Sequence, residues 1–534
     1  MFGEPQNQFS LTGAALSTCR AQKQIPISIG DANERKGFIA DSARSFAARR
    51  IGKREFLRRL GLAGVGLSSF AATMLGGNRH FRAVAAPQAL GQTGPSADMT
   101  NWLRDVGRKY KGTKIRYVSE ATPPTVVAKL LAKDEFTANT GIEVDIEIVP
   151  LEQVLARVTG DAQAKAGAYD LFYLDQSWTS LFVGDTVDPR ELYEHKRDLA
   201  LPGFDWSDFS KPLMQGISTY RDRLVGIPFD IPIFILMYRK DLFEKHKLKV
   251  PTTMDEYLSA VKTLDAAERG NGIHGTTGQL KAGHYSLNCD WTSWLWANGG
   301  SVFGKDGFFC GGDEDGMRGL AYMLELVKYM PSDAKTWTWD GEGQSLRQGN
   351  AAMTISWGEF FPAFDGADSK VVGLMEAARP PAETRLRAPA EAGFQEVPHI
   401  GHQGGSSIGL SRYSKNQDAA WLFMQWVCSK DVGARSALLG SGSAAVRTST
   451  YKDPRVLAAA KVGPGTTRHF PATEWTINNA MGSEPKLPAW VEISNHIIPD
   501  ELGKLLAGQY GSPAQCMAVV KERVDKAAEP FRKG

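Results

Sequence analysis

Residues 222–265 constrain the fold more than any other stretch of the chain. They read DRLVGIPFDIPIFILMYRKDLFEKHKLKVPTTMDEYLSAVKTLD, an apolar run in which Pro228 and Pro232 flank a single acid, Asp230. A central strand excludes two prolines, because each proline lacks the N–H group that the ladder needs. A segment that crosses between two lobes can hold them. The pattern therefore predicts a chain that builds two lobes and passes from one to the other here.

The region before this stretch alternates between two hydrophobic periods. Some segments alternate apolar and charged residues, as strands do, and others repeat apolar residues at helical spacing up to a stop at Thr140-Gly141. The resulting βαβαβ order predicts a parallel sheet covered by helices. The strands are expected at 115–118, 142–149 and 169–174, and the helices at 126–139 and 151–167.

The chain of 534 residues is long enough for two large or three ordinary domains, and the pattern of elements continues beyond the crossing. An N-cap at Thr252 or Thr253 predicts the start of the next helix. Helices are expected at 255–267, 290–297 and 316–329 and again from 490, with a turn and strand over 344–359 and an extended segment at 406–410 followed by a helix from 416.

Five segments, in their order and spacing, resemble the family 1 extracellular solute-binding proteins, the maltose-binding-like receptors of ABC importers. Arg239 stands where the family has Asn, and Met254 where it has Trp. The resemblance covers residues 112–530. The segments are the crossing stretch with MYRKDLF, EFTANTGIEVDIEIV (135–149), YDLFYLDQSWTSLF (169–182), QSLRQGNAAMTISWGE (344–359) and GGSSIGLSRYSKNQDAAWLF (404–423).

The resemblance implies an α/β fold of two lobes, the type II periplasmic-binding-protein fold, with parallel or mixed sheets flanked by helices and a ligand cleft between the lobes. Hinge closure would bury the ligand, and a transporter permease would recognise the closed form. The protein is then expected to be a monomeric receptor and not an enzyme. The expected parts are a leader (1–85), a linker with a short helix (86–111), lobe 1 (112–228 and 406–446) and lobe 2 (229–405 and 447–534).

The N-terminal segment has the features of an export signal. Residues 1–85 hold 13 Lys or Arg against five acids, whereas the rest of the chain is net negative. Lys53-Arg54-Glu55-Phe56-Leu57-Arg58 resembles the twin-arginine motif with Lys in place of the first arginine. A mild apolar stretch at 60–75, too short to span a membrane, and Ala83-Val84-Ala85 follow it. We expect export to the periplasm, and the basic leader gives no reason to expect nucleic-acid binding.

Four cysteines remain once Cys19 leaves with the leader. In an oxidising compartment Cys289 and Cys310 are the most plausible pair, and free buried thiols are an equally good alternative. No CxxC motif or Cys/His cluster predicts a metal, and no cofactor is expected.

Sugar and polyol sites stack aromatic rings on the C–H face of the ligand and bind its hydroxyl groups with carboxylates or amides. In open parallel sheets, ligands bind beyond the carboxyl ends of the strands. Both devices occur at the positions where the resembling family lines its cleft. The expected ligand-binding residues are Asp175, Trp178, Asp230, Asp290, Trp291, Trp294, Trp357, Glu359, Gly405 and Arg447.

Several of these residues have a simple structural alternative. Trp294 at helical spacing would also suit a core helix, and Asp230 between prolines could cap a turn. Arg447 could pair with a surface carboxylate, and Gly405 could let two backbones approach closely.

Two other functions compete with a sugar or polyol receptor. Carboxylates between aromatic walls would also bind a polyamine, so the solute stays open. Gly405-Ser406-Ser407-Ile408-Gly409 fits the G-x-S-x-G elbow of hydrolases, but its extended surroundings argue against the strand–turn–helix that the elbow needs. Paired carboxylates of a glycoside hydrolase remain an alternative on sequence alone. A receptor for signalling rather than import would use the same pair of lobes.

Overall fold

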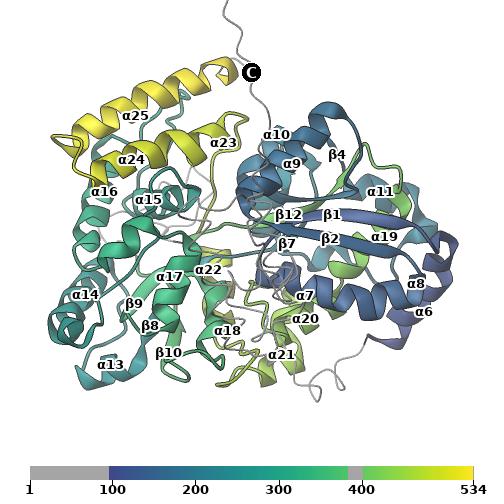
Figure 1. Cartoon of the computed structure of the whole chain (residues 1–534), viewed down its shortest axis with the longest axis horizontal. Helices are drawn as coiled ribbons and strands as arrows, with labels where there is room; N and C mark the ends of the chain where they lie inside the picture. The colour runs from purple at the N-terminus through teal and green to yellow at the C-terminus, as the bar shows by residue number, and fades with distance from the viewer. Residues whose placement is uncertain (1–94, 383–400, 533–534) are drawn as a thin grey trace, which may run out of the picture. The chain divides into compact units, whose positions relative to one another are not determined.

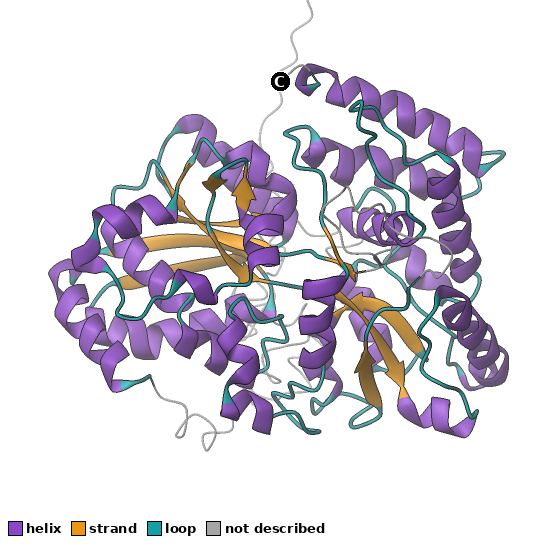
Figure 2. Ribbon diagram, turned by 180° about the vertical axis from the view of Figure 1, so that it is seen from behind, coloured by secondary structure: helices purple, strands orange, loops and turns teal. Residues whose placement is uncertain are grey.

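The computed structural model describes residues 95–382 and 401–532 of the chain. The expected leader and the first part of the expected linker lie outside these residues. Within the described ranges, no helix is both long and apolar enough to span a membrane. Figures 1 and 2 show two separate groups of strands, each flanked by helices.

The first sheet has six strands in the order β2-β1-β3-β12-β4, with β7 also paired to β12. β1 runs parallel to β2 and β3, while β12 runs antiparallel to β3, β4 and β7. The predicted parallel βαβαβ unit is confirmed, and it forms part of a mixed sheet. The strands are β1 Lys114–Glu120, β2 Glu143–Val149, β3 Leu171–Asp175, β4 Thr186–Val187, β7 Ile227–Asp230 and β12 Ser406–Ser411.

The helix after β1 ends where its sequence predicts but begins at Pro123, three residues before the expected start at 126. Thr122 caps it by accepting a hydrogen bond from the Thr125 N–H, and Pro123 occupies the first turn, where no N–H is needed. The helix continues through a π-helical segment and stops at Gly141, whose φ of 75° is the left-handed conformation of a C-cap. Up to the crossing the helices are α6 Ala97–Gly107, α7 Pro123–Leu131, α8 Ala138–Thr140, α9 Leu151–Ala164, α10 Thr179–Phe182, α11 Pro189–His195 and α12 Lys211–Leu213.

Part of the expected linker folds onto the first lobe. The helix expected at 99–109 is α6, and its Met99, Trp102 and Leu103 are buried. α6 approaches α8 so closely that a Cβ on Gly107 would lie 2.4 Å from Thr140 Cγ2. We therefore propose that lobe 1 begins with α6 rather than at residue 112.

The chain crosses between the sheets where the two prolines lie. Pro228 belongs to β7, which pairs with β12 alone among the described strands, so its missing N–H costs no ladder bond on the other side. Pro232 lies in the link 231–233 between β7 and β8. The second sheet has the order β10-β8-β9 and is antiparallel, with β8 Phe234–Arg239, β9 Met353–Trp357 and β10 Met375–Ala378.

The helices around the second sheet follow the predicted order. Thr253 and Glu256 form a reciprocal capping box at the start of α14. α15 begins at Tyr285, earlier than the expected residue 290, because the His284 ring accepts the N–H of Ser286 as a cap. After the crossing the helices are α13 Lys240–Lys245, α14 Met254–Glu268, α15 Tyr285–Ala297, α16 Glu314–Val327, α17 Trp339–Arg347, α18 Phe361–Phe364, α22 Phe470–Asn479, α23 Trp490–Glu492, α24 Ile498–Leu506 and α25 Pro513–Ala528.

The chain returns to the first lobe through residues 401–406. A short parallel ladder joins β11 (Gly401–His402) to β13 (Met481–Gly482) beside this passage. The returning segment continues into β12 and then α19 Gln417–Val427, α20 Lys430–Leu438 and α21 Pro454–Ala458, and a separate hairpin joins β5 Thr219–Tyr220 to β6 Arg223–Leu224.

Residues 447–458 contact the first lobe. The Thr448 and Ser449 hydroxyl groups both donate to Asp208, which precedes the crossing. α21 packs with α20 through Ala434, Ala437 and Val456. We therefore propose that the lobe boundary lies after α21 and not at residue 446.

The described cysteines are free thiols, which is one of the two alternatives that the sequence left open. Cys289, Cys428 and Cys516 are buried, and Cys310 is half-buried with its thiol donating to the Ser301 carbonyl. The Cys289–Cys310 disulfide is not formed. The lobe around Cys428 is held by apolar packing instead, with Phe136 and Phe423 at a ring distance of 5.2 Å.

Candidate functional site

Three carboxylates meet at one edge of the first sheet. Glu120, Asp175 and Asp230 are the last residues of β1, β3 and β7. β3 and β7 both run antiparallel to β12, and Ser406 of β12 is the register partner of Asp175 on one side and Asp230 on the other. The carboxyl ends of these strands therefore coincide, which is where open α/β sheets bind ligands.

Asp230 and Asp175 are both buried but are held differently. Asp175 Oδ1 accepts hydrogen bonds from the N–H of Ser177 at 2.8 Å and from its hydroxyl at 2.5 Å. Neither carboxylate oxygen of Asp230 has a hydrogen-bond partner within the described residues, and its exposed fraction is 0%. Burial raises the pKa of both carboxyls to about 7, and the hydroxyls of Thr122 and Ser443 offset part of that rise for Asp230.

The second lobe faces these acids with two more. Glu359 follows β9, and its Oε2 is buried without a partner among the described residues. Burial raises the pKa of Glu359, and the charges of Asp230, Glu120 and Asp340 raise it further. The Glu359 backbone also touches the segment after α20, since a Cβ on Gly442 would lie 2.2 Å from the Glu359 carbonyl oxygen.

We call these five carboxylates the acidic cluster: Glu120, Asp175, Asp230, Asp340 and Glu359. Burial is the main cause of the raised pKa values, and like charges within the cluster add to it. Elsewhere the chain supplies a cation to a buried acid, as Arg190 does for Asp188 at 2.7 Å. In residues 95–382 and 401–532 no member of the acidic cluster has such a partner. Asp340 keeps solvent access, so the cluster is open to water on that side.

Two predicted site residues are tied together inside the second lobe. The Trp357 indole N–H donates to Gln279 Oε1 at 3.0 Å, and the Gln279 amide donates to Asp290 Oδ1 at 2.9 Å. Asp290 lies beside Glu342, which accepts two hydroxyl groups of β9. Burial raises the pKa of Asp290 to about 7 and that of Glu342 to about 8, with the Asp290 charge adding to the latter.

A second polar network lies where the chain passes between the lobes. The amide of Gln176, just after β3, donates to the Gln403 carbonyl at 2.9 Å and to the Tyr285 hydroxyl at 3.3 Å. The buried carboxylate of Glu484 joins the same network. It accepts from Tyr285 at 2.8 Å, Asn288 at 2.8 Å and Trp490 at 2.7 Å. Burial raises the pKa of Glu484 to about 8. These residues link the end of β3 to α15 and to the two later segments that contain Gln403 and Glu484.

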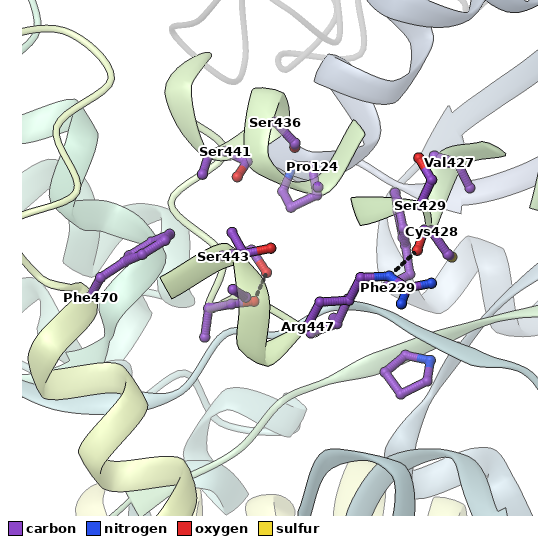
Figure 3. Close-up of a pocket in the computed structure, with 17 residues that line it drawn as sticks. Pro124, Phe229, Val427, Cys428, Ser429, Ser436, Ser441, Ser443, Arg447 and Phe470 are labelled. Atoms are coloured by element: carbon purple, nitrogen blue, oxygen red, sulfur yellow. Dashed lines mark hydrogen bonds between the residues drawn. The ribbon is translucent and has the colours of Figure 1, made fainter. Parts of the chain in front are cut away.

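A cavity lies next to Asp230, on the side of α20 (Figure 3). It has an empty volume of about 510 Å³, part of it open to solvent. Figure 3 shows Phe229, Ser443 and Phe470 on its walls together with Pro124. The acidic cluster itself does not line this cavity, although Ser443 borders both.

Arg447 occupies one wall of that cavity, and two of its three side-chain nitrogens are hydrogen-bonded by the protein. Its Nε donates to the Cys428 carbonyl at 2.7 Å, and one terminal nitrogen donates to the Asp205 carbonyl at 3.0 Å. The guanidinium lies 3.9 Å from the centre of the Phe209 ring. It therefore anchors residues 447–458 to the first lobe.

Three predicted tryptophans are packed against other rings. Trp178 lies 6.5 Å from Phe182, Trp291 stacks on Phe309 at 6.2 Å, and Trp294 packs on Tyr322 at 5.0 Å. All three are buried. The sequence alternative, in which residues at helical spacing belong to the core, describes Trp291 and Trp294 in this structure.

Gly405 lets two backbone segments approach closely, which is the structural alternative that the sequence analysis gave for it. Its carbonyl accepts the Gln176 N–H at 2.9 Å, and a Cβ there would lie 2.3 Å from Ile217 Cδ1. The structure therefore brings Asp175, Asp230 and Glu359 together and links Asp290 to Trp357, while Arg447 is hydrogen-bonded to the Cys428 and Asp205 carbonyls.

Sequence reasoning missed several residues of these networks, among them Glu120, Asp340, Gln279 and Glu484. Glu120 ends a strand that was expected to stop at residue 118, so its place at the sheet edge was not seen. Asp340 lies in the first turn of α17, which no pattern marked. Gln279 and Glu484 lie in irregular segments, where no periodicity predicts which side chain is buried.

The hydrolase pattern around Ser407 lacks its required geometry. Ser406–Ser411 is a strand paired on both sides, with a shift of register toward β7 between Ser406 and Ser407, and not a strand–turn–helix elbow. The Ser407 hydroxyl is buried and hydrogen-bonds the Ser218 hydroxyl at 2.6 Å. This serine therefore has a structural role.

The family model for bacterial extracellular solute-binding proteins matches residues 121–434. The chain belongs to this family. A probable amino-acid ABC transporter periplasmic-binding protein of Sinorhizobium fredii is 23% identical over 389 residues, which are 71% of this chain and 83% of that protein. These matches bear out the resemblance to solute-binding proteins of ABC transporters.

Solved structures of solute-binding proteins share the fold. An Agrobacterium radiobacter K84 protein in complex with ribitol is 26% identical, with a TM-score of 0.67 over 79% of this chain and 99% of that one. Maltose-bound MalE3 of T. maritima is 20% identical, with a TM-score of 0.66 over 78% and 99% of the two chains. The expected two-lobe, type II periplasmic-binding-protein fold is therefore confirmed.

The raised pKa values predict that the ligand-free solute-binding protein loses stability between pH 6.5 and pH 8. A carboxyl whose pKa is higher in the folded than in the unfolded chain keeps a proton that the unfolded chain lacks, so raising the pH through the folded pKa removes stability. Each such carboxyl contributes a loss of about 1 kcal/mol. These carboxyls are Asp175, Asp230 and Asp290, whose pKa is raised to about 7, and Glu342 and Glu484, whose pKa is raised to about 8.

Three buried bases act in the opposite direction and more weakly in this window. Burial lowers the pKa of His402 to about 3, of His469 to about 4 and of Lys486 to about 8. Urea unfolding at pH 6.5 and pH 8 measures the balance. Asp230→Asn should reduce the loss, and Asp418→Asn, distant on α19, should leave it unchanged. A stability that rises with pH in the parent protein would contradict the assignment.

Proposed function

We propose that this protein is the receptor of an ABC importer and binds a carbohydrate or a polyol between its two lobes. The observation that carries the proposal is the acidic cluster, in which carboxylates at the strand ends of one lobe face Glu359 of the other. A solute held by both lobes stabilises the closed arrangement by its differential affinity. The solved relatives supply the substrate class, since their bound solutes include ribitol, D-mannitol and maltose.

The chemistry of the cluster suits a hydroxylated solute. Ionised carboxylates accept hydrogen bonds from hydroxyl groups, and these charge-assisted bonds are the strong ones. A half-buried aromatic residue neighbours three of the acids in sequence, in the pairs Phe229–Asp230, Trp339–Asp340 and Glu359–Phe360. We propose Asp175, Asp230 and Glu359 as ligand-binding residues, together with Glu120 and Asp340, and leave out Trp291, Trp294 and Arg447.

The name of the Sinorhizobium relative raises an amino acid as a second solute. An α-carboxylate would need a cation or a set of N–H donors at the site, and the described residues around the acidic cluster offer no Lys or Arg. We therefore favour a carbohydrate or polyol over an amino acid as the solute.

We further propose that the protein acts in the periplasm, reaches it through the twin-arginine pathway, and catalyses no reaction. The family is extracellular by description, and the motif at residues 53–58 supports the route. The strand geometry around Ser407 supports the absence of hydrolase chemistry.

A thermal-shift panel tests the binding proposal. The protein from residue 86 onward is mixed with ribitol, D-mannitol, tagatose, maltose, amino acids and polyamines. A bound solute at a hundredfold excess over its Kd should add about 2.7 kcal/mol of stability. Glu359→Gln should reduce the shift, while Asp418→Asn should preserve it. If no solute shifts the melting temperature and a chromogenic glycoside or ester is hydrolysed, the receptor proposal is wrong.

The export route has its own test in the producing cell. Arg54→Lys removes the one arginine left at the two twin-arginine positions of the motif, and we expect the protein to accumulate in the cytoplasm. Fractionation followed by immunoblotting measures this, and Arg35→Lys, upstream in the leader, is the matched control. Undiminished export of the Arg54→Lys protein would contradict the twin-arginine route.

A further inference from the structure

When its carboxyls are ionised, the acidic cluster carries more negative charge than a neutral solute can balance. Its carboxylates lie at the ends of strands and at the start of α17, and burial makes each ionised group costly unless a positive charge or a set of donors is nearby. A hydroxyl group of a sugar supplies a donor but no charge. The cluster is therefore electrostatically incomplete with a neutral ligand alone.

Other buried acids of this chain have hydrogen-bond or ion-pair partners within the protein. Glu268 accepts a hydrogen bond from Lys245 at 2.7 Å, and Asp365 pairs with Arg468 at 2.8 Å. Glu484, which has no close Lys or Arg, is satisfied by three side-chain donors. Asp230 is as deeply buried, but neither of its carboxylate oxygens has a hydrogen-bond partner of normal geometry in the described chain. The hydroxyls of Thr122 and Ser443 lie near it and offset only part of the rise in its pKa.

Asp230 also lies at the centre of the cluster. Its charge raises the pKa of Glu120, of Asp175 and of Glu359, and no other carboxylate affects all of these. Glu359 approaches from the second lobe and leaves its own Oε2 without a partner in the described chain. The unpartnered carboxylate oxygens of Asp230 and Glu359 thus belong to opposite lobes, and the charge of Asp230 raises the pKa of Glu359.

His284, Arg447 and Lys486 are basic residues that are hydrogen-bonded to groups outside the acidic cluster. His284 pairs with Glu152 at 2.9 Å, while its charge acts on Asp340. Arg447 donates to the Cys428 carbonyl, and Lys486 donates to backbone carbonyls of residues 215 and 219. No basic residue is among the groups that act on the pKa of Asp230.

We propose that the solute carries a protonated amine, which binds between Asp230 of the first lobe and Glu359 of the second. The inference rests on the proposed receptor function and narrows its substrate class to amino sugars, amino polyols and related amines. The amine donates to both carboxylates and supplies the missing charge. It thereby joins the lobes across the cleft, and its charge-assisted bonds are stronger than those of a hydroxyl group at the same place.

Matched pairs of solutes test the charge alone. Sorbitol is compared with 1-amino-1-deoxysorbitol, ribitol with 1-amino-1-deoxyribitol, and 1,4-butanediol with putrescine, by calorimetric titration at pH 7. In at least one pair the amine should bind about tenfold to a hundredfold more tightly than its hydroxyl counterpart, as a hydrogen bond to a charged group predicts.

The outcomes separate the two proposals. If sorbitol or ribitol binds as tightly as its amine, the receptor proposal stands and the amine proposal falls, because protonated carboxyls then suffice as donors. If Mg²⁺ or Ca²⁺ alone shifts the melting temperature and the amines do not, the cluster is a metal site and the amine proposal also falls. If no member of any pair and no solute of the wider panel binds, both proposals fall.

Two variants locate the amine. Asp230→Asn keeps the shape of the side chain and should abolish the preference for the amine, while the ligand-free variant should melt no lower than the parent protein. Glu359→Gln tests the second lobe in the same way, should Asp230→Asn fail to fold. Asp418→Asn removes an acid elsewhere in the first lobe and should keep the preference. An Asp230→Asn protein that still prefers the amine would overturn the assignment.

Discussion

The carboxylate of Asp230 is buried without a hydrogen-bond partner in the described chain, and the geometry around it depends on the crossing between the lobes. Ser406 of β12 is the register partner of Asp230, which fixes the end of β7, and the link 231–233 carries the chain directly into β8. An unsatisfied buried acid costs stability. The position of Asp230 is set by the pairing of β7 with β12 on one side and by the link 231–233 on the other. The side chain is therefore held in the interior and not exposed to solvent.

The two polar networks have different parts in this arrangement. The network of Gln176, Gln403 and Glu484 is complete, since its members donate to and accept from one another across the passages between the lobes. A satisfied network of this kind specifies one geometry. The acidic cluster is incomplete, since its central carboxylates lack donors. A receptor needs a well-defined hinge together with a binding site whose polar groups lack partners. The ligand then supplies the missing interactions and so stabilises the closed form.

Local patterns predicted the framework of the site but not its membership. The alternation over 142–149 and the stop at Gly141 predicted the parallel unit, because period and capping are local properties. The rule for the carboxyl ends of strands then led to Asp175, and the proline pattern led to Asp230. Trp291, Trp294 and Arg447 have the residue types of a sugar site, but burial against Phe309, Tyr322 and Phe209 depends on tertiary packing. Glu120, Asp340 and Gln279 were missed for the same reason.

Proton exchange on binding measures the central claim most directly. If a protonated amine enters the acidic cluster, it lowers the pKa values of carboxyls that hold protons near pH 7, and binding releases protons. Calorimetric titration of the amine at pH 7 in two buffers of different ionisation enthalpy gives the number of protons exchanged. We predict a net release that Asp230→Asn reduces. Binding with no proton exchange, or with proton uptake, would contradict the account.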